Sequence, residues 1–386
     1  MNRYLDFCNT DRQREIVNAI TAHGNPTAAA RALECDDSMA RKVWREIKRR
    51  AAQSGYSPEH DMTHEVAPGF NVKGTSTLYD MEGNAKLQWV KTSADMQHQL
   101  EAMQAAADAF ASDLPKAKAV KLNGSDHSAE LLNQYTITDY HLGLLAWGEE
   151  TRGDDYDLSI AENLIIKWFE QAIISSPKSE TAILAQLGDF CHFDSMDAVT
   201  PASGHILDAD TRLQKMVRVT IRISRAVVSM LLDKHKDVYI LWCDANHDPA
   251  SSAWMREWLR AFYEDEPRVT VDISPDSYYC HEFGKVSLFF HHGHKRKVAS
   301  LDDVLVAKFR DVFGRTKYSY AHTGHLHSKE VLSTNLMKIE QHETLAAADA
   351  YASRGGWISD RSAQVITYHK EYGEVGRVRL TPEMVL

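Results

Sequence analysis

Residues 238–248 read VYILWCDANHD, an apolar run that passes directly into polar side chains able to bind metals or move protons. The apolar part, Val238–Cys243, has the length and the branched and aromatic composition of a buried β-strand. The same arrangement recurs at residues 138–143 (TDYHLG), 187–190 (LGDF), 291–294 (HHGH) and 323–327 (TGHLH). Because ligands in α/β folds bind at the carboxyl ends of strands, we expect these five polar clusters to converge on one site.

The sequence around these clusters alternates between strand-like and helix-like segments, which predicts a layered α/β domain over residues 129–386. The expected strands are residues 134–139, 182–188, 238–243, 269–273, 286–291, 318–322 and 365–369. The expected helices are residues 159–175, 208–234, 251–264 and 301–313.

The ligand types in the clusters favour a metal site. Histidine is the commonest metal ligand, and this chain has 19 histidines, seven of them between residues 281 and 327. Carboxylate, imidazole and one amide oxygen suit divalent manganese, iron or zinc. One carboxylate can bridge two such ions, which is the geometry used for phosphoester hydrolysis.

The ordered motifs Asp-x-His, Gly-Asp, Asn-His-Asp, His-Gly-His and Gly-His-x-His, between residues 130 and 335, resemble the calcineurin-like metallophosphoesterases. The resemblance implies a β-sandwich flanked by helices that holds two divalent ions, with manganese favoured over iron or zinc. It assigns the first ion to Asp139, His141, Asp189 and His327. Asp189 would bridge to the second ion, which is completed by Asn246, His292 and His325.

The resemblance also implies the catalytic residues. Water held by the two ions would attack phosphorus, and His247 would contact the scissile phosphate or protonate the leaving oxygen. Asp248 would orient the His247 imidazole, which is an ordinary general-acid arrangement. His291 competes with His292 as ligand, and we favour His292 because a glycine follows it. The usual second aspartate is displaced by one residue, to Asp194, where we expect a structural role.

Residues 1–55 predict a small helix-turn-helix domain. Thr10 and Gly24 are suited to cap the two ends of its first helix, and a basic helix runs to about Ala52. Residues 1–52 carry a net charge of +3, whereas the whole chain carries −10. Basic side chains on such a helix can contact DNA, although a solvated helix face is the alternative. The residues expected at DNA are Arg41, Lys42, Arg45, Lys48 and Arg49.

Residues 56–128 predict a linker, a β-hairpin (residues 70–78 and 87–91) and an amphipathic helix over residues 93–112. The helix has two open interpretations. It either clasps the catalytic domain or pairs with a second chain, which would make a homo-oligomer. The sequence does not decide between them.

The charge distribution and the motifs together favour a metal-dependent phosphodiesterase that acts on DNA, as an endonuclease, a nickase or a 3′-to-5′ exonuclease. The domain is similar to the SbcD-like nuclease branch of the family, and the whole arrangement is similar to phage and prophage proteins. The alternatives are a phosphomonoesterase for phosphoproteins or small phosphoesters, and a non-catalytic DNA-binding protein. Five unpatterned cysteines and the absence of a long apolar run lead us to expect a cytoplasmic protein, in a bacterial host if phage-encoded, with no membrane partner.

Overall fold

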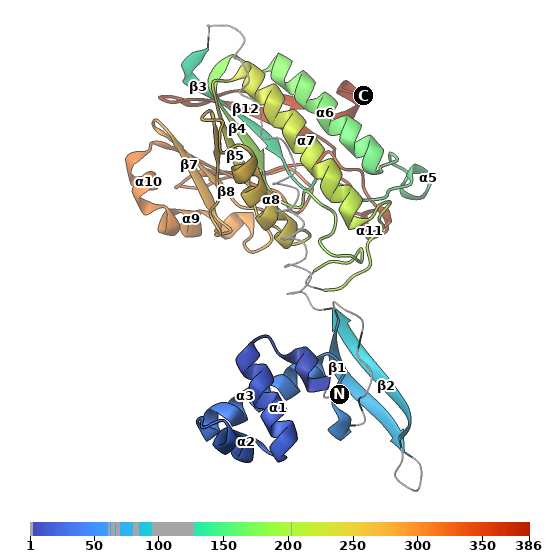
Figure 1. The fold of residues 1–386 in the computed structure, drawn as a ribbon. Coiled ribbons are helices and arrows are strands. Elements are labelled where there is room, and N and C mark those ends of the chain that lie inside the picture. The colour runs from blue at the N-terminus through green and yellow to red at the C-terminus, as the bar shows by residue number, and fades with distance from the viewer. Residues whose placement is uncertain are drawn as a thin grey trace. The chain divides into compact units, whose positions relative to one another are not determined.

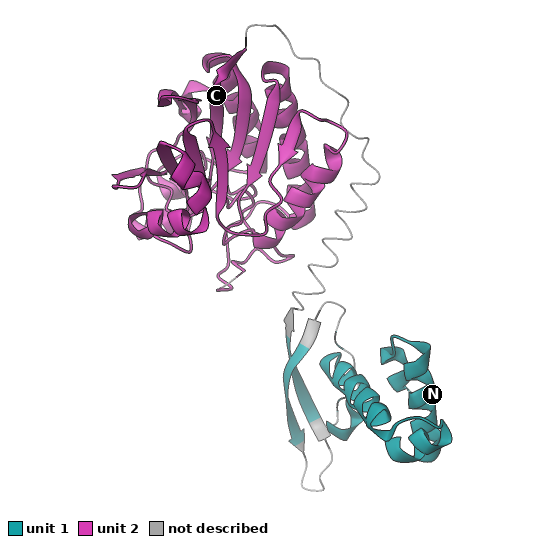
Figure 2. Ribbon diagram, turned by 90° about the vertical axis from the view of Figure 1, so that its left-hand side faces the viewer, with its two compact units in different colours: residues 1–103 teal, residues 104–386 magenta. Residues whose placement is uncertain are grey.

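The computed structural model describes residues 3–60, 62, 66, 70–79, 85–94, 127–201 and 203–386. The chain divides into two compact units, residues 1–103 and residues 104–386 (Figure 2). The predicted helix over residues 93–112 lies, beyond residue 94, outside the described residues. Residues 93 and 94 belong to a strand instead.

The first unit contains the helices and the hairpin that were expected. Its helices are η1 (Arg3–Phe7), α1 (Asp11–His23), α2 (Pro26–Ala32), α3 (Asp37–Gln53) and η2 (Pro58–His60). Thr10 accepts a hydrogen bond from Gln13 N, and Gly24 ends α1 with φ +82°, so both predicted caps of α1 are present. The hairpin pairs β1 (Phe70–Tyr79) with β2 (Ala85–Ala94) in antiparallel register. It groups with the helices rather than with the following linker.

The second unit is built on a six-stranded sheet of order β13-β12-β3-β4-β5-β6. Strands β3 to β6 run parallel, whereas β12 is antiparallel to both β3 and β13. The strands are β3 (Ser128–Ile137), β4 (Ser179–Gln186), β5 (Asp237–Trp242), β6 (Val269–Val271), β12 (Ala363–His369) and β13 (Gly373–Leu380).

A five-stranded sheet of order β10-β11-β9-β8-β7 forms the second layer of strands. Its strands are β7 (Tyr279–Phe283), β8 (Val286–Phe290), β9 (Tyr318–Thr323), β10 (Glu330–Ser333) and β11 (Lys338–Gln341). One core cluster joins the two sheets: Leu132, Ile183, Leu241 and Ile366 from the first pack with Leu288 and Phe290 from the second. This buried cluster makes the unit a β-sandwich.

Helices cover the outer faces of the sandwich (Figure 1). On the first sheet, α6 (Leu158–Ser175) lies beside α7 (Leu213–Lys234), and Phe169 of α6 stacks on Tyr135 of β3. The helix α8 (Pro249–Phe262) packs against β5 and β6. The second sheet is covered by η3 (Val298–Ser300) and α9 (Asp302–Lys308), which pack on Phe289. The remaining elements are α5 (Gly148–Thr151), α10 (Arg310–Arg315), α11 (Ala350–Gly355) and η4 (Pro382–Met384).

The predicted fold class, an α/β sandwich flanked by helices with a small helical N-terminal part, is confirmed. Two helix boundaries were wrong. The predicted helix 301–313 is broken at Phe309, where the chain turns so that this ring packs on Phe289 at 5.7 Å between centroids. The predicted helix 208–234 begins only at Leu213, because the residues before it pair with the segment after β3.

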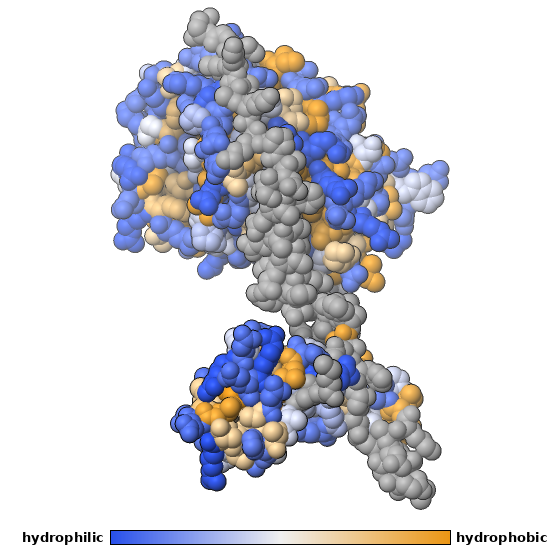
Figure 3. All heavy atoms as spheres, viewed as in Figure 1, coloured by the Kyte–Doolittle hydropathy of each residue, from blue (hydrophilic) through white to orange (hydrophobic). Residues whose placement is uncertain are grey.

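Polar side chains dominate the face of the second unit that Figure 3 shows, with apolar residues scattered between them. Among the described residues, no helix combines the length and the apolar composition needed to cross a bilayer.

Candidate metal centre

The predicted ligands converge at the carboxyl ends of two groups of neighbouring parallel strands. Asp139 follows β3, Asp189 follows β4 and Asn246 follows β5, all in the first sheet. His292 follows β8 and His325 follows β9, in the second sheet. Three groups of potential ligand atoms form there, each with all atoms within 4.8 Å of one another. The groups are Asp139/His141/His327, Asp189/His292/His325 and His141/His192/His247.

The potential metal-ligand atoms in this cluster lie at hydrogen-bond distance from one another or slightly farther apart. His327 Nε2 lies 3.3 Å from Asp139 Oδ1 and 3.2 Å from His141 Nε2. His292 Nε2 lies 3.0 Å from both Asp189 Oδ2 and Asn246 Oδ1, and 3.9 Å from Asp139 Oδ1. The two groups are therefore contiguous, and His292 and Asp139 connect them.

Left-handed backbone marks most of the cluster. Seven described non-glycine residues have positive φ, and five of them are predicted ligands. Such a conformation costs a non-glycine residue of order 1–3 kcal/mol and persists only where surrounding structure imposes it. The five are Asp139 (50°), His141 (47°), Asp189 (50°), His325 (76°) and His327 (55°).

The oxygens of the two aspartates are divided between the main chain and the cluster. Asp139 Oδ2 accepts hydrogen bonds from Thr138 Oγ1 (2.6 Å) and His325 N (2.8 Å), while the buried Oδ1 faces His327 Nε2 at 3.3 Å. Asp189 Oδ1 accepts from the main-chain N–H of Asn246 and His247. Each carboxylate thus anchors a loop with one oxygen and turns the other towards the imidazoles.

The electrostatics of His292 follow from this placement. Burial alone would lower the pKa of His292, but the carboxylates of Asp189 and Asp139 outweigh it and raise the pKa to about 9. His292 Nδ1 donates to the main-chain oxygen of Leu187 at 3.0 Å. Nε2 is therefore the nitrogen available to a cation, and a cation there would replace its proton.

These residues fit two divalent cations. The buried Asp139 Oδ1 faces His327 Nε2 at 3.3 Å without a well-formed hydrogen bond, and two imidazole nitrogens, on His141 and His327, face each other directly. A cation bound between this oxygen and these two nitrogens would give each of the three atoms a partner. The set of carboxylates, imidazoles and one amide oxygen suits manganese, iron or zinc.

The predicted role of Asp248 as the group that orients His247 does not agree with the geometry. His247 Nδ1 lies 3.0 Å from the main-chain oxygen of His192. Asp248 is buried, and its carboxylate accepts hydrogen bonds from Cys191 N (2.8 Å) and Ser252 Oγ (3.3 Å). The cause is local: α8 starts directly after Asp248, and this turns the carboxylate away from the preceding imidazole and towards the loop after β4.

The loop after β4 supplies a further imidazole, which the sequence placed at the rim of the site without assigning it a role. His192 is buried, its Nδ1 lies 3.3 Å from His141 Nδ1, and its Nε2 has no partner. Burial lowers the pKa of His192 to about 3, so the ring is neutral. Its position three residues after Asp189 was the only signal, and loop packing was the favoured interpretation of that position.

Two other residues, His291 and Asp194, have structural roles. His291 donates from Nδ1 to the main-chain oxygen of Ser277 and stacks on Tyr278, outside the three groups, whereas His292 belongs to the group with Asp189 and His325. Asp194 accepts from the main-chain N–H of Ala250 and Ser251 at the start of α8. Burial raises the pKa of Asp194 to about 6.

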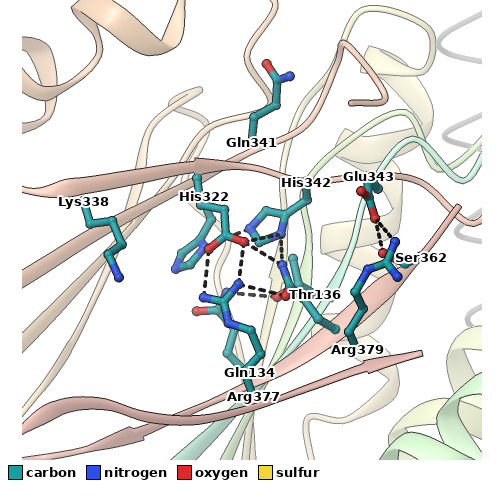
Figure 4. Close-up of polar contacts among 12 residues, drawn as sticks. Gln134, Thr136, His322, Lys338, Gln341, His342, Glu343, Ser362, Arg377 and Arg379 are labelled. Carbon is teal, nitrogen blue, oxygen red and sulfur yellow. Dashed lines mark hydrogen bonds and ion pairs between the residues drawn. The ribbon is translucent and has the colours of Figure 1, made fainter. Parts of the chain in front are cut away.

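A separate buried cluster contains His322, Glu340 and His342, which could also hold a metal by their spacing. Figure 4 shows His322 and His342 side by side, with Arg377 close by. Arg377 engages both oxygens of Glu340, at 2.5 and 2.9 Å, and Gln364 donates to Glu340 and His342. Since these ligand atoms already have partners, we interpret the cluster as a structural network.

The expected DNA contacts all lie on α3. Arg41 pairs with Asp37 at 2.8 Å, and Lys48 pairs with Glu59 at 2.7 Å. Within the described part of the chain, the exposed Lys42, Arg45 and Arg49 have no carboxylate partner. A free basic face thus remains on this helix.

No family model matches the sequence, and no curated protein matches it. Similar solved structures include a predicted phosphoesterase from Streptococcus pneumoniae, with 8% identity over 65% of this chain and 97% of that chain (TM-score 0.28). An archaeal phosphodiesterase shows 13% identity over 65% and 99% of the two chains (TM-score 0.33). Vacuolar Protein Sorting 29 from Cryptosporidium parvum shows 13% identity over 65% and 98% (TM-score 0.29). These identities and TM-scores are too low to transfer an activity to this chain.

Proposed function

We propose that the chain is a dinuclear-metal phosphodiesterase that cleaves DNA. One observation carries this proposal: two carboxylates, one amide and the imidazoles from five strand ends meet at the rim of one sandwich. Asp139, His141, His327 and Asp189 would hold one cation, and Asp189, Asn246, His292 and His325 the other. When bound, such a pair polarises phosphate oxygens and lowers the pKa of water.

The protein groups around the phosphate would position it and move a proton. The main-chain oxygen of His192 can only accept, so the His247 Nδ1 carries a proton and its Nε2 is the exchangeable nitrogen. In its protonated form His247 can donate the Nε2 proton to the leaving oxygen. Asp189 holds the main-chain N–H of His247 at 2.8 Å, which keeps the imidazole beside the cluster.

The choice of DNA rests on the first unit. The basic face of α3 offers Lys42, Arg45 and Arg49 to phosphates, and helices of this kind read duplex DNA. A DNA-binding unit tethered to a phosphodiesterase raises the effective concentration of DNA at the catalytic unit.

The test is cleavage of end-labelled single-stranded, nicked, gapped and duplex DNA with manganese, with Asp189→Asn as the inactive control. Cleavage by the wild-type chain alone, on at least one of these substrates, is the expected result. Efficient hydrolysis of an aryl phosphomonoester with no cleavage of DNA or of an aryl diester would contradict the proposal and favour a phosphomonoesterase.

A further inference from the structure

Two extended segments lie beside each other next to the metal-ligand cluster. Asp210 N donates to the main-chain oxygen of Gly143 (3.3 Å), and Leu145 N donates to that of Asp208 (3.0 Å). Leu144 and Ala209 form an antiparallel bridge between these hydrogen bonds. Gly143 is only two residues beyond His141, so the paired segments continue directly from the cluster.

The first of these segments, residues 143–147, alternates between the interior and solvent. Leu144 and Ala146 are buried, whereas Leu145 and Trp147 are exposed. The exposed fraction of Trp147 is 57%, and Ile206 of the second segment is also exposed. A large, flat indole is therefore presented to solvent a few residues from the predicted ligands.

The second segment borders a cavity of about 400 Å³, lined by Ala209, Asp210, Thr211, Arg212 and Lys215. Within the described part of the chain, neither Arg212 nor Lys215 forms an ion pair. The Thr211 hydroxyl oxygen is buried without a hydrogen-bond partner. The Asp210 carboxylate also lines the cavity, but it already accepts a hydrogen bond from Leu158 N at the start of α6.

The start of α7 adds to the positive character of the cavity. This helix has 22 residues, and no side chain caps its first turn at Arg212. Its free N–H groups and the helix dipole favour an anion at this end. The cavity thus combines two cations that form no ion pair, the Asp210 carboxylate, whose charge Lys215 feels, a buried hydroxyl without a hydrogen-bond partner and a helix start.

We propose that this surface, residues 143–147 and 206–215, binds the nucleic-acid strand that flanks the scissile phosphate. Arg212 and Lys215 take a backbone phosphate in the cavity, and Trp147 stacks on a base. A polynucleotide supplies both anions and aromatic rings along one strand, which matches an exposed indole at one end of the paired segments and a basic cavity at the other. The inference rests on the proposed phosphodiesterase function and names the strand-binding part of that site.

The phosphate contact is tested in the full-length chain with Arg212→Ala/Lys215→Ala, with Lys178→Ala/Lys317→Ala as the matched control. The control removes the same charge from two exposed lysines directly before β4 and β9, whereas the cluster follows the ends of these strands. We expect the KM for a single-stranded oligonucleotide to rise about tenfold, and the slope of log affinity against log salt to fall by about 0.7, the value for one phosphate contact. Hydrolysis of bis(4-nitrophenyl) phosphate, which has no flanking strand, should stay within twofold of wild type.

The stacking contact is tested with Trp147→Ala against Tyr372→Ala, an exposed aromatic in the β12–β13 turn. We expect Trp147→Ala to weaken oligonucleotide binding about tenfold and to abolish the preference for a normal strand over an abasic one. The Tyr372→Ala chain should keep both properties.

Unchanged oligonucleotide kinetics in both variants would overturn the inference, and so would equal losses on the oligonucleotide and the small diester. If the wild-type chain cleaves neither substrate, the proposed phosphodiesterase function fails. Equilibrium binding of a labelled oligonucleotide then tests the proposed strand-binding surface by itself. Lys42, Arg45 and Arg49 are replaced by alanine in every chain compared, so that the first unit does not contribute. Weaker binding by the Arg212→Ala/Lys215→Ala chain supports the inference, and equal binding overturns it.

Discussion

The Nδ1 atom of His247 lies 3.0 Å from the main-chain oxygen of His192, and this contact fixes which nitrogen of His247 can exchange a proton. A carbonyl oxygen only accepts, so Nδ1 is protonated and Nε2 is left for the substrate. The contact links the loops after β4 and β5.

This tautomer predicts a leaving-group effect. His247→Ala should lower kcat on a DNA or alkyl diester by about 10²–10⁴-fold, because the leaving alkoxide then departs without a proton. The loss on a 4-nitrophenyl diester should be much smaller, since nitrophenolate leaves without protonation. Parallel kcat measurements on the two substrates check this, with His294→Ala as control. Equal losses on both would argue against a general-acid role.

Metal binding should release protons in a pH-dependent way. The pKa of His292 is about 9, so this imidazole is protonated at pH 7 and must lose its proton to bind a cation. Manganese affinity should therefore rise with pH up to about 9 and level off above it. Calorimetric titration in buffers of different ionisation enthalpy measures the released protons. An affinity that is flat between pH 7 and pH 9 would contradict the assignment of His292.

Gly324 is predicted to be irreplaceable. A Cβ at this position would overlap Thr138 Oγ1 and Asp139 Oδ2, and Asp139 would have to move from the cluster. Gly324→Ala should lower manganese affinity at least tenfold. Gly314→Ala is the matched control, because a Cβ there meets nothing within 4 Å and Gly314 lies in α10. That variant should bind metal normally and gain up to about 1 kcal/mol in unfolding free energy.

The basic face of α3 should contribute to DNA affinity in proportion to its charge. Replacing Lys42, Arg45 and Arg49 with alanine should lower the salt slope of duplex binding by about 2.7, which is 0.9 for each phosphate contact. Fluorescence anisotropy across a salt series measures this slope. The small-diester activity should be unaffected, since α3 belongs to the other compact unit. An unchanged slope would favour the solvated-face interpretation.

His235 should make the protein sensitive to acid. Its Nδ1 donates to the Ser179 main-chain oxygen, its Nε2 accepts from Tyr135, and burial lowers its pKa to about 3. The unfolded chain binds the proton at about pH 6.5, so this contribution is complete above pH 6.5 and is lost as pH falls towards 3.

The slope from His235 approaches about 1.4 kcal/mol per pH unit within that window. Urea unfolding of His235→Gln between pH 4 and 7 should show a correspondingly shallower dependence of unfolding free energy on pH. The exposed His205→Gln serves as control and should keep the wild-type slope.

Much of the fold followed from the sequence because each motif directly follows an apolar run. In the sequence, a strand is followed by a polar cluster and then by a helix. This order placed Asp139, Asp189 and His292 at strand ends, where they also lie in the structure. Strands β7, β10, β11 and β13 were missed because their sequences mix charged and apolar residues; β7, β10 and β13 are edge strands, whereas β11 lies inside the second sheet.

The unpredicted parts of the site depend on contacts between distant segments. Adjacency suggested that Asp248 orients His247, but the start of α8 directs the carboxylate to Cys191 N, 57 residues away in sequence. His192 had no distinguishing spacing, and only the approach of the β3 and β4 loops brings it to His141. Sequence spacing cannot report such contacts.

At the five predicted ligands with left-handed backbone, the residue type that favours folding stability differs from the residue type that favours metal binding. Glycine would adopt those conformations without steric cost, so replacing Asp139 or His141 by glycine would relieve strain in the metal-free chain while removing a donor. At these turns the strain can therefore be relieved only by giving up a ligand, so the metal-free chain carries a cost in folding free energy that only the function of the side chains can offset.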